Sequence, residues 1–198
     1  MNVLSDAFRQ VASDLNGRNL RWALVGGFAV SARAEPRFTR DIDIAVAVHT
    51  DADAEQLVRS LIGGGYRLFA SVEQDTTGRL ATVRLTRKVT AEDDVVVDLL
   101  FASSGIEPEI AAAAELLEIL PGLSLPVATA GHLIALKVLA RDDETRPQDL
   151  ADLRALHAEA TAKDLEDARE ALKIITERGY HRDRDLLLAF DKSAPHAD

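Results

Sequence analysis

The sequence predicts an α/β (α+β) fold in which a mixed sheet is followed by a C-terminal helical region. Short apolar segments of strand character alternate with helical segments through the first 128 residues. Two pairs of these strands are joined by short turns, which implies antiparallel pairing, and only helical patterns follow residue 129. We therefore expect an α/β unit in residues 1–128 and a helical region in residues 129–198 that packs on it.

The predicted strands are short apolar runs bounded by glycine, proline or polar turns. The segment 94–101 is the most apolar of them, and the hairpin near the middle of the chain turns at Pro121-Gly122. In chain order, the predicted strands cover residues 21–25, 41–48, 66–72, 80–85, 94–101, 116–120 and 123–127.

The predicted helices have apolar residues at a spacing of three and four, and several have a recognisable start or stop. Asn16-Gly17 ends the first, Thr129 caps the helix that follows the hairpin, and Pro147 opens the next one. A short helix follows Gly26-Gly27, and the other predicted helices cover residues 5–15, 51–62, 107–114, 132–141, 148–158, 163–178 and 183–190.

Composition restricts the classes of protein that are possible. The 198 residues suffice for one sizeable domain, or for a domain with a modest helical appendage. There is no cysteine, which excludes disulfides and thiolate metal sites. No apolar run is long enough to span a membrane, and the N-terminus lacks the layout of a signal peptide. We expect a soluble, cytoplasmic protein with no membrane partner.

The net charge of −10 is distributed unevenly. Residues 1–105 hold 12 basic and 14 acidic side chains, whereas residues 106–198 hold 11 basic and 19 acidic ones. This excess of acid argues against a broad surface for long nucleic acids, although a local arginine patch can still hold an RNA end. Small substrates are compatible with this charge.

Asp41 and Asp43 are the first candidate site residues. Two positions apart on a strand, they leave the same face about 7 Å apart along the chain, so both carboxylates can reach one metal ion. Bulky residues alternate with them on the opposite face, which predicts that one face is core and the other is open beside the carboxylates. The alternative is a pair that caps a helix or ends a loop.

Asp-x-Asp by itself is weak evidence, because about two such pairs are expected by chance in a chain of this composition. Three occur, and the pairs at 51/53 and 183/185 lie in polar stretches, where we expect solvated charge. The pair at 41/43 is distinguished by its apolar strand.

Asp98 is the third candidate, in the middle of the strand 94–101. Burying a carboxylate without a partner costs several kcal/mol, so Asp98 requires a cation or a hydrogen-bond donor. If its strand lies beside that of Asp41 and Asp43, three carboxylates converge and can hold two divalent ions about 3.5 to 4 Å apart. The alternative is a salt bridge to an arginine such as Arg84.

Glycines and arginines beside the aspartate strand are candidates for binding phosphate. Gly26 and Gly27 let the backbone approach a bound group closely and expose N–H groups at a helix N-terminus, although a simple tight turn needs Gly-Gly equally. Arg37 and Arg40 can hold phosphates or neutralise the aspartates. We expect Arg33 to be a solvated helix residue.

Together these motifs resemble the nucleotidyltransferase fold of the DNA polymerase β superfamily. The resemblance rests on the Gly26-Gly27 turn at a helix N-terminus, the Asp41-Ile42-Asp43 strand about fifteen residues later, and Asp98 in VVVDLLF. Within the superfamily, VGGFAV, RFTRDIDI, HLIALKVLA and DLADL resemble the AbiEii-like toxin nucleotidyltransferases, over roughly residues 20–157.

The resemblance implies a magnesium-dependent enzyme that moves a nucleoside monophosphate from a triphosphate to an acceptor hydroxyl. Asp41, Asp43 and Asp98 would bind two Mg²⁺ ions, and Asp98 would also take the proton of the attacking hydroxyl. Lys137 would lie near the phosphates, although a lysine among apolar neighbours is also typical of a snorkelling surface residue. The acceptor would be RNA, such as a tRNA end, or a protein, with an antitoxin as partner; a small hydroxyl compound is the alternative.

Two further interpretations stay open. Asp149 and Asp152 share a helix face and either take part in the site or suit the dipole of a helix N-terminus. The protein could also keep the fold as a non-catalytic nucleotide-binding protein or as a plain α/β domain. In that plain domain, loss of Asp43 or Asp98 destabilises the protein, whereas in the enzyme the metal-free variant is equally or more stable.

Overall fold

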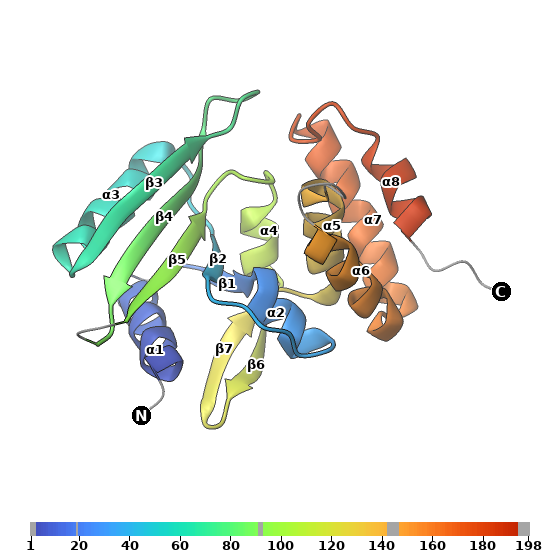
Figure 1. Ribbon diagram of the computed structural model, residues 1–198. Helices are drawn as coiled ribbons and strands as arrows, with labels where there is room; N and C mark the ends of the chain where they lie inside the picture. Colours follow the sequence, from blue (N-terminus) through green and yellow to red (C-terminus); the bar gives the residue numbers. More distant parts are fainter. Residues whose placement is uncertain (1–2, 19, 91–92, 142–146, 194–198) are drawn as a thin grey trace.

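A seven-stranded mixed sheet organises the computed structural model, which describes residues 3–18, 20–90, 93–141 and 147–193 (Figure 1). The strand order is β3-β4-β5-β2-β1-β7-β6. The strands are β1 (Trp22–Val25), β2 (Ile42–Val46), β3 (Tyr66–Glu73), β4 (Leu80–Lys88), β5 (Asp94–Leu100), β6 (Glu115–Leu120) and β7 (Leu123–Val127). All seven predicted strands are confirmed, with ends shifted by at most three residues.

The pairing is parallel for β2 with β5 and for β1 with β7, and antiparallel for the other four neighbouring pairs. Both hairpins predicted from short connections, β3-β4 and β6-β7, are antiparallel as expected. The strand of Asp98 lies beside the strand that follows Asp41, so the condition for bringing the three carboxylates together is met.

Eight helices are found among the described residues, each where the sequence predicts one. They are α1 (Val3–Asn16), α2 (Gly26–Arg33), α3 (Asp51–Gly63), α4 (Glu107–Ala112), α5 (Ala130–Ala140), α6 (Pro147–Glu159), α7 (Ala162–Glu177) and α8 (Leu186–Ser193). The apolar stripe predicted for α1, which includes Phe8 and Leu15, is buried in the core. Thr129 caps α5 by accepting a hydrogen bond from the His132 N–H at 3.3 Å.

The C-terminal helices form a group of their own beside the sheet (Figure 1). Helix α5 is apolar on most sides because it contacts α6, α7 and α8, and it buries Leu133, Ile134 and Val138. Helix α2 contacts both α5 and α6, so the Gly26-Gly27 turn at its start is held between the sheet and the helical group. None of the helices within the described ranges has the length and apolarity needed to span a membrane.

Candidate active site

A row of side-by-side residues crosses the middle of the sheet and contains two of the three candidate aspartates. Val25 of β1 is paired with Asp43 of β2, Asp43 with Asp98 of β5, and Asp98 with Arg84 of β4. Directly opposed residues of neighbouring strands share a face. The register therefore places Asp43, Asp98 and Arg84 on one face of the sheet, with Asp41 immediately before β2.

Arg84 holds two of the aspartates. Its Nε donates to Asp98 Oδ1 at 2.8 Å and its Nη2 to Asp98 Oδ2 at 2.6 Å, a bidentate pair. The same Nη2 reaches Asp41 Oδ2 at 3.2 Å. The salt bridge that the sequence offered as the alternative for Asp98 is thus present, and it satisfies the requirement that this buried carboxylate meet a cation.

Asp43 differs from its two neighbours. Within the described part of the chain, its carboxylate has no hydrogen bond or ion pair. Burial, and then the nearby charges of Asp98 and Asp41, raise the pKa of Asp43 to about 7, against the weaker opposing influence of Lys137 and Arg84. Asp43 is therefore a carboxyl group whose ionised form lacks a sufficient counter-charge.

The Gly26-Gly27 turn is in contact with these groups. Gly26 has φ +62°, and a Cβ atom placed on it would lie 2.0 Å from Asp43 Oδ2. A Cβ atom on Gly27 would lie 2.7 Å from Arg37 Nη2 and 2.8 Å from Thr39 Oγ1. Each glycine is needed here because a side chain would collide with a polar group of the site.

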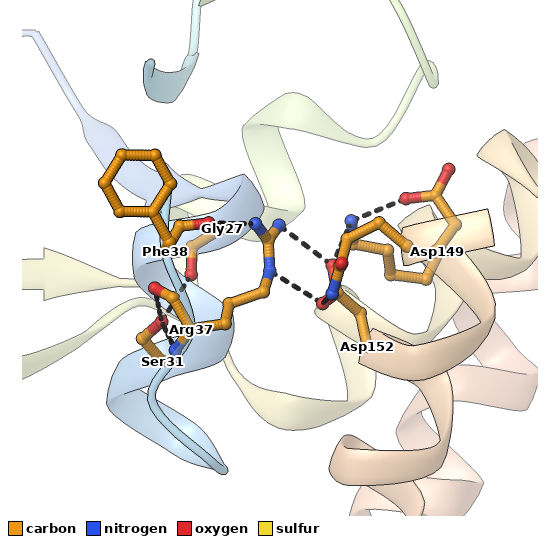
Figure 2. A network of polar contacts seen from close by, with 8 residues as sticks. Gly27, Ser31, Arg37, Phe38, Asp149 and Asp152 are labelled. Carbon is orange, nitrogen blue, oxygen red and sulfur yellow. Dashed lines mark hydrogen bonds and ion pairs between the residues drawn. The ribbon is translucent and has the colours of Figure 1, made fainter. Parts of the chain in front are cut away.

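A buried network of charges joins this turn to the helical region, as Figure 2 shows. Asp152 of α6 accepts from Arg37 Nη2 at 3.0 Å, and its Oδ1 lies 2.7 Å from Arg37 Nε. Lys137 of α5 lies 2.7 Å from both Asp152 Oδ2 and Asp149 Oδ1. Burial alone would raise the pKa of Asp152, but hydrogen bonds from Lys137, Gln148 and Arg37 lower it below its ordinary value.

We predict that Asp152→Asn lowers the free energy of unfolding by about 2 kcal/mol, because the buried charges of Arg37 and Lys137 lose their shared partner. Asp167, whose pair with Lys163 is exposed, is the matched control, and Asp167→Asn should change it by less than about 0.5 kcal/mol. Urea denaturation of the three proteins at a pH of about 7.5 measures both changes. Equal effects of the two substitutions would contradict a stabilising role of the network.

The network answers several questions that the sequence left open. Lys137 is neither a snorkelling surface residue nor free, because its side chain is only 12% exposed and pairs with two carboxylates. Asp149 and Asp152 are joined by ion pairs to Lys137, and Asp152 also pairs with Arg37. The expectation for Arg33 is wrong: it is largely buried, pairs with Glu115 at 2.6 Å and donates to the Ala128 carbonyl, because α2 packs against the β6-β7 hairpin.

Arg40 and the other two Asp-x-Asp pairs have different surroundings. Arg40 is exposed, its guanidinium lies 5.2 Å from the centre of the Phe38 ring, and it makes no ion pair with a described residue. Asp53 forms a capping box with Thr50, and Asp51 pairs with Arg79 at 3.0 Å. Asp185 accepts from the Leu188 N–H at the start of α8, so these aspartates serve helix ends and an ion pair.

The three candidate aspartates, the Gly26-Gly27 turn and Lys137 line one cleft of about 1290 Å³. One wall is the face of the sheet with the β3-β4 hairpin, and the opposite wall is formed by α5 with the start of α6. The cleft contains each residue predicted for the site, namely Gly26, Gly27, Arg37, Arg40, Asp41, Asp43, Asp98 and Lys137. It also contains Arg84, which the sequence suggested only as a structural partner of Asp98.

The comparison with protein families identifies the family of this chain. The family model described as "Nucleotidyl transferase AbiEii toxin, Type IV TA system" matches residues 12–196. The chain belongs to the AbiEii nucleotidyltransferase family. This AbiEii-family protein is therefore an enzyme that transfers nucleotidyl groups, and such enzymes are typically metal-dependent. No curated protein matches its sequence.

Solved structures share the fold. An antigenic nucleotidyltransferase-like protein from Paracoccidioides brasiliensis is 17% identical, with a TM-score of 0.52, over 93% of this chain and 90% of that one. The antibiotic-resistance factor ANT(2'')-Ia is 18% identical, also with a TM-score of 0.52, over 97% of this chain and 94% of that one. At these identities the likeness confirms the nucleotidyltransferase fold of this AbiEii-family protein and nothing finer.

Proposed function

We propose that this enzyme moves a nucleoside monophosphate from a nucleoside triphosphate to an acceptor hydroxyl in a Mg²⁺-dependent reaction. The observation that carries the proposal is the row of Asp43 and Asp98 on parallel neighbouring strands, with Asp41 beside it and the Gly26-Gly27 turn against Asp43. No structural role accounts for Asp43, since the pKa of its carboxyl group is raised and the carboxylate pairs with no described cation.

The donor set suits Mg²⁺, which prefers carboxylate oxygens. In the described part of the chain, the three carboxylates are not drawn together as a ready-made metal cluster. The Arg84 guanidinium lies against Asp41 and Asp98, which indicates that this group of oxygens accepts a cation. Asp41, Asp43 and Asp98 would hold two Mg²⁺ ions, which when bound neutralise charge on the phosphates.

The other groups of the cleft would bind and orient the substrates. The N–H groups at the start of α2, together with Arg40, would contact the triphosphate, and Arg37 and Lys137 would add positive charge beside them. The acceptor hydroxyl oxygen would attack the α-phosphorus while the bond to pyrophosphate breaks, and Asp98 would take the hydroxyl proton. Residues 1–128 would supply the carboxylates, and residues 129–198 would supply Lys137, Asp149 and Asp152.

For the acceptor, we propose a hydroxyl group of an RNA, such as a tRNA end, or of a protein, in a cytoplasmic toxin-antitoxin setting with an antitoxin as partner. The family's description as a type IV toxin supports this setting. A specific observation favours a small, positively charged hydroxyl compound as the second candidate. Glu73, Asp75 and Asp183 line the same cleft as the arginines, and their negative charge is complementary to a cationic acceptor.

Thermal unfolding with each of the four triphosphates, with and without Mg²⁺, tests the proposed function. A ligand at about a hundred times its Kd adds ~2.7 kcal/mol, which raises Tm by roughly 5 to 10 °C in a chain of this size. We expect a rise that requires both Mg²⁺ and a triphosphate and that is lost in Asp43→Asn. A rise of equal size in that variant would contradict the assignment of the aspartates to the metal and nucleotide.

A further inference from the structure

Arg84 occupies the position at the aspartates where a cation is needed. Its fork contacts both oxygens of Asp98, and Nη2 contacts Asp98 Oδ2 and Asp41 Oδ2 at the same time. A divalent ion would bind the same carboxylate oxygens of Asp98 and Asp41 that Arg84 now contacts. One guanidinium carries one positive charge, which leaves the group of three carboxylates with an excess of negative charge.

The surroundings of Arg84 allow its side chain to leave this position. The side chain is 40% exposed and lies in the cleft, whereas the Asp98 side chain beneath it is only 10% exposed. Its neighbour in the row on the edge strand β3 is Ala70, whose short side chain leaves the cleft side of Arg84 uncrowded. Moving Arg84 outward therefore opens no cavity in the core and keeps the charge in contact with water.

A displaced Arg84 would remain within a cleft that also contains the phosphate-binding candidates Gly26, Gly27 and Arg40. Arginine recognises carboxylate and phosphate through the same planar fork of donors. The side chain can therefore exchange one oxyanion partner for another without a change in its own charge.

We propose that Arg84 is an exchangeable cation of the active site. It neutralises Asp41 and Asp98 while metal is absent, yields their oxygens to the divalent ions, and then binds the phosphates of the bound triphosphate. This inference rests on the proposed function, because it assigns the metal and the triphosphate to the same cleft. It adds a nucleotide-binding residue and predicts that metal binds more weakly in the absence of nucleotide than it would without Arg84.

Binding of Mn²⁺ in the absence of nucleotide tests the first step. The bound fraction is measured from the decrease in the EPR signal of free Mn²⁺. Arg84→Met keeps the length and apolar stem of the side chain and removes the competing charge. We expect it to bind Mn²⁺ about tenfold more tightly than wild type, since one partly exposed ion pair no longer competes. Arg79→Met is the matched control, because Arg79 is similarly exposed and paired with Asp51 outside the cleft, and it should leave Mn²⁺ affinity unchanged.

Calorimetric titration of the same proteins with each triphosphate in saturating Mg²⁺ tests the second step. We expect Arg84→Met to bind the preferred triphosphate about tenfold more weakly, and Arg84→Lys to fall between the two. These opposite changes in metal and nucleotide affinity distinguish exchange from a purely structural role, which would weaken both.

Three results would overturn the inference. Mn²⁺ affinity that is unchanged in Arg84→Met would show that Arg84 does not compete with metal, and weaker affinity would make it a positioning residue for the carboxylates. Unchanged triphosphate affinity would remove the second step. The proposed function fails separately if neither wild type nor Arg84→Met binds Mn²⁺, or if Asp43→Asn binds it as well as they do.

Discussion

Asp43→Asn is expected to lower nucleotidyl transfer by about 10³-fold or more, because the substitution removes a proposed metal ligand and with it several kcal/mol of charge stabilisation. The same substitution is expected to make the metal-free protein more stable at a pH of about 8. Both effects follow from one feature, a carboxylate held among other carboxylates without a counter-charge of its own. Activity is measured as pyrophosphate release with Mg²⁺ and each triphosphate.

The pH dependence of stability follows from the raised pKa of Asp43. In the unfolded chain this carboxyl ionises near 3.8, whereas in the folded protein it ionises at about 7. As the pH rises from about 4 through 7, the unfolded state loses its proton first, so stability present at low pH is progressively lost. The amide of the Asp43→Asn variant cannot titrate, so the variant's advantage over wild type should grow by about 1 to 2 kcal/mol between about pH 5 and pH 8, allowing for solvent screening.

Urea denaturation in the presence of EDTA at these two pH values measures the difference. Asp167→Asn, at an exposed ion pair, is the control for general effects of removing a negative charge from an acidic protein. A variant that is less stable than wild type at the higher pH without metal would indicate that Asp43 has a structural partner, and the plain α/β interpretation would then be favoured.

The structure shows that Asp43 and Asp98 should differ in their effect on stability, a difference that the sequence could not reveal. For the enzyme, the sequence predicts that removal of either aspartate leaves the metal-free protein equally or more stable. Asp98, however, is the bidentate partner of Arg84, so its removal also takes away a favourable ion pair. This difference depends on the register between β4 and β5, because a shift by one residue would turn Arg84 to the other face of the sheet.

The elements of the fold were predictable because their signals are local. Period-two apolar strands, short turns and helix stops are all present in the sequence, and the observed elements follow them. The partners of charged residues were less predictable, since they depend on how elements distant in sequence pack. Arg37, in the loop after α2, and Asp152 of α6 are 115 positions apart, and they meet where α2 packs against the C-terminal helices.

Gly26→Ala is expected to have the largest effect on stability of any small substitution in the site, lowering the free energy of unfolding by about 3 to 4 kcal/mol. Part of the cost is the left-handed backbone, with φ +62°, which an L-residue adopts at about 1 to 2 kcal/mol. The rest is the collision of the new Cβ with Asp43, whose Oδ2, Cγ and Cβ would lie at 2.0, 2.5 and 2.8 Å. Transfer activity should fall as well, because the carboxylate must move.

Gly78 separates the two causes, since it has φ +65° but no atom within 4 Å of the position that an added Cβ would take. Gly78→Ala should therefore show the backbone cost alone, about 1 to 2 kcal/mol. In an Asp43→Ala background the collision at Gly26 is partly relieved, and the Gly26→Ala cost should shrink by at least about 1 kcal/mol. Additive effects of the two substitutions would mean that the turn does not press on Asp43. A non-additive result would show that this turn, for which we propose a role in phosphate binding, also fixes the position of the Asp43 carboxylate.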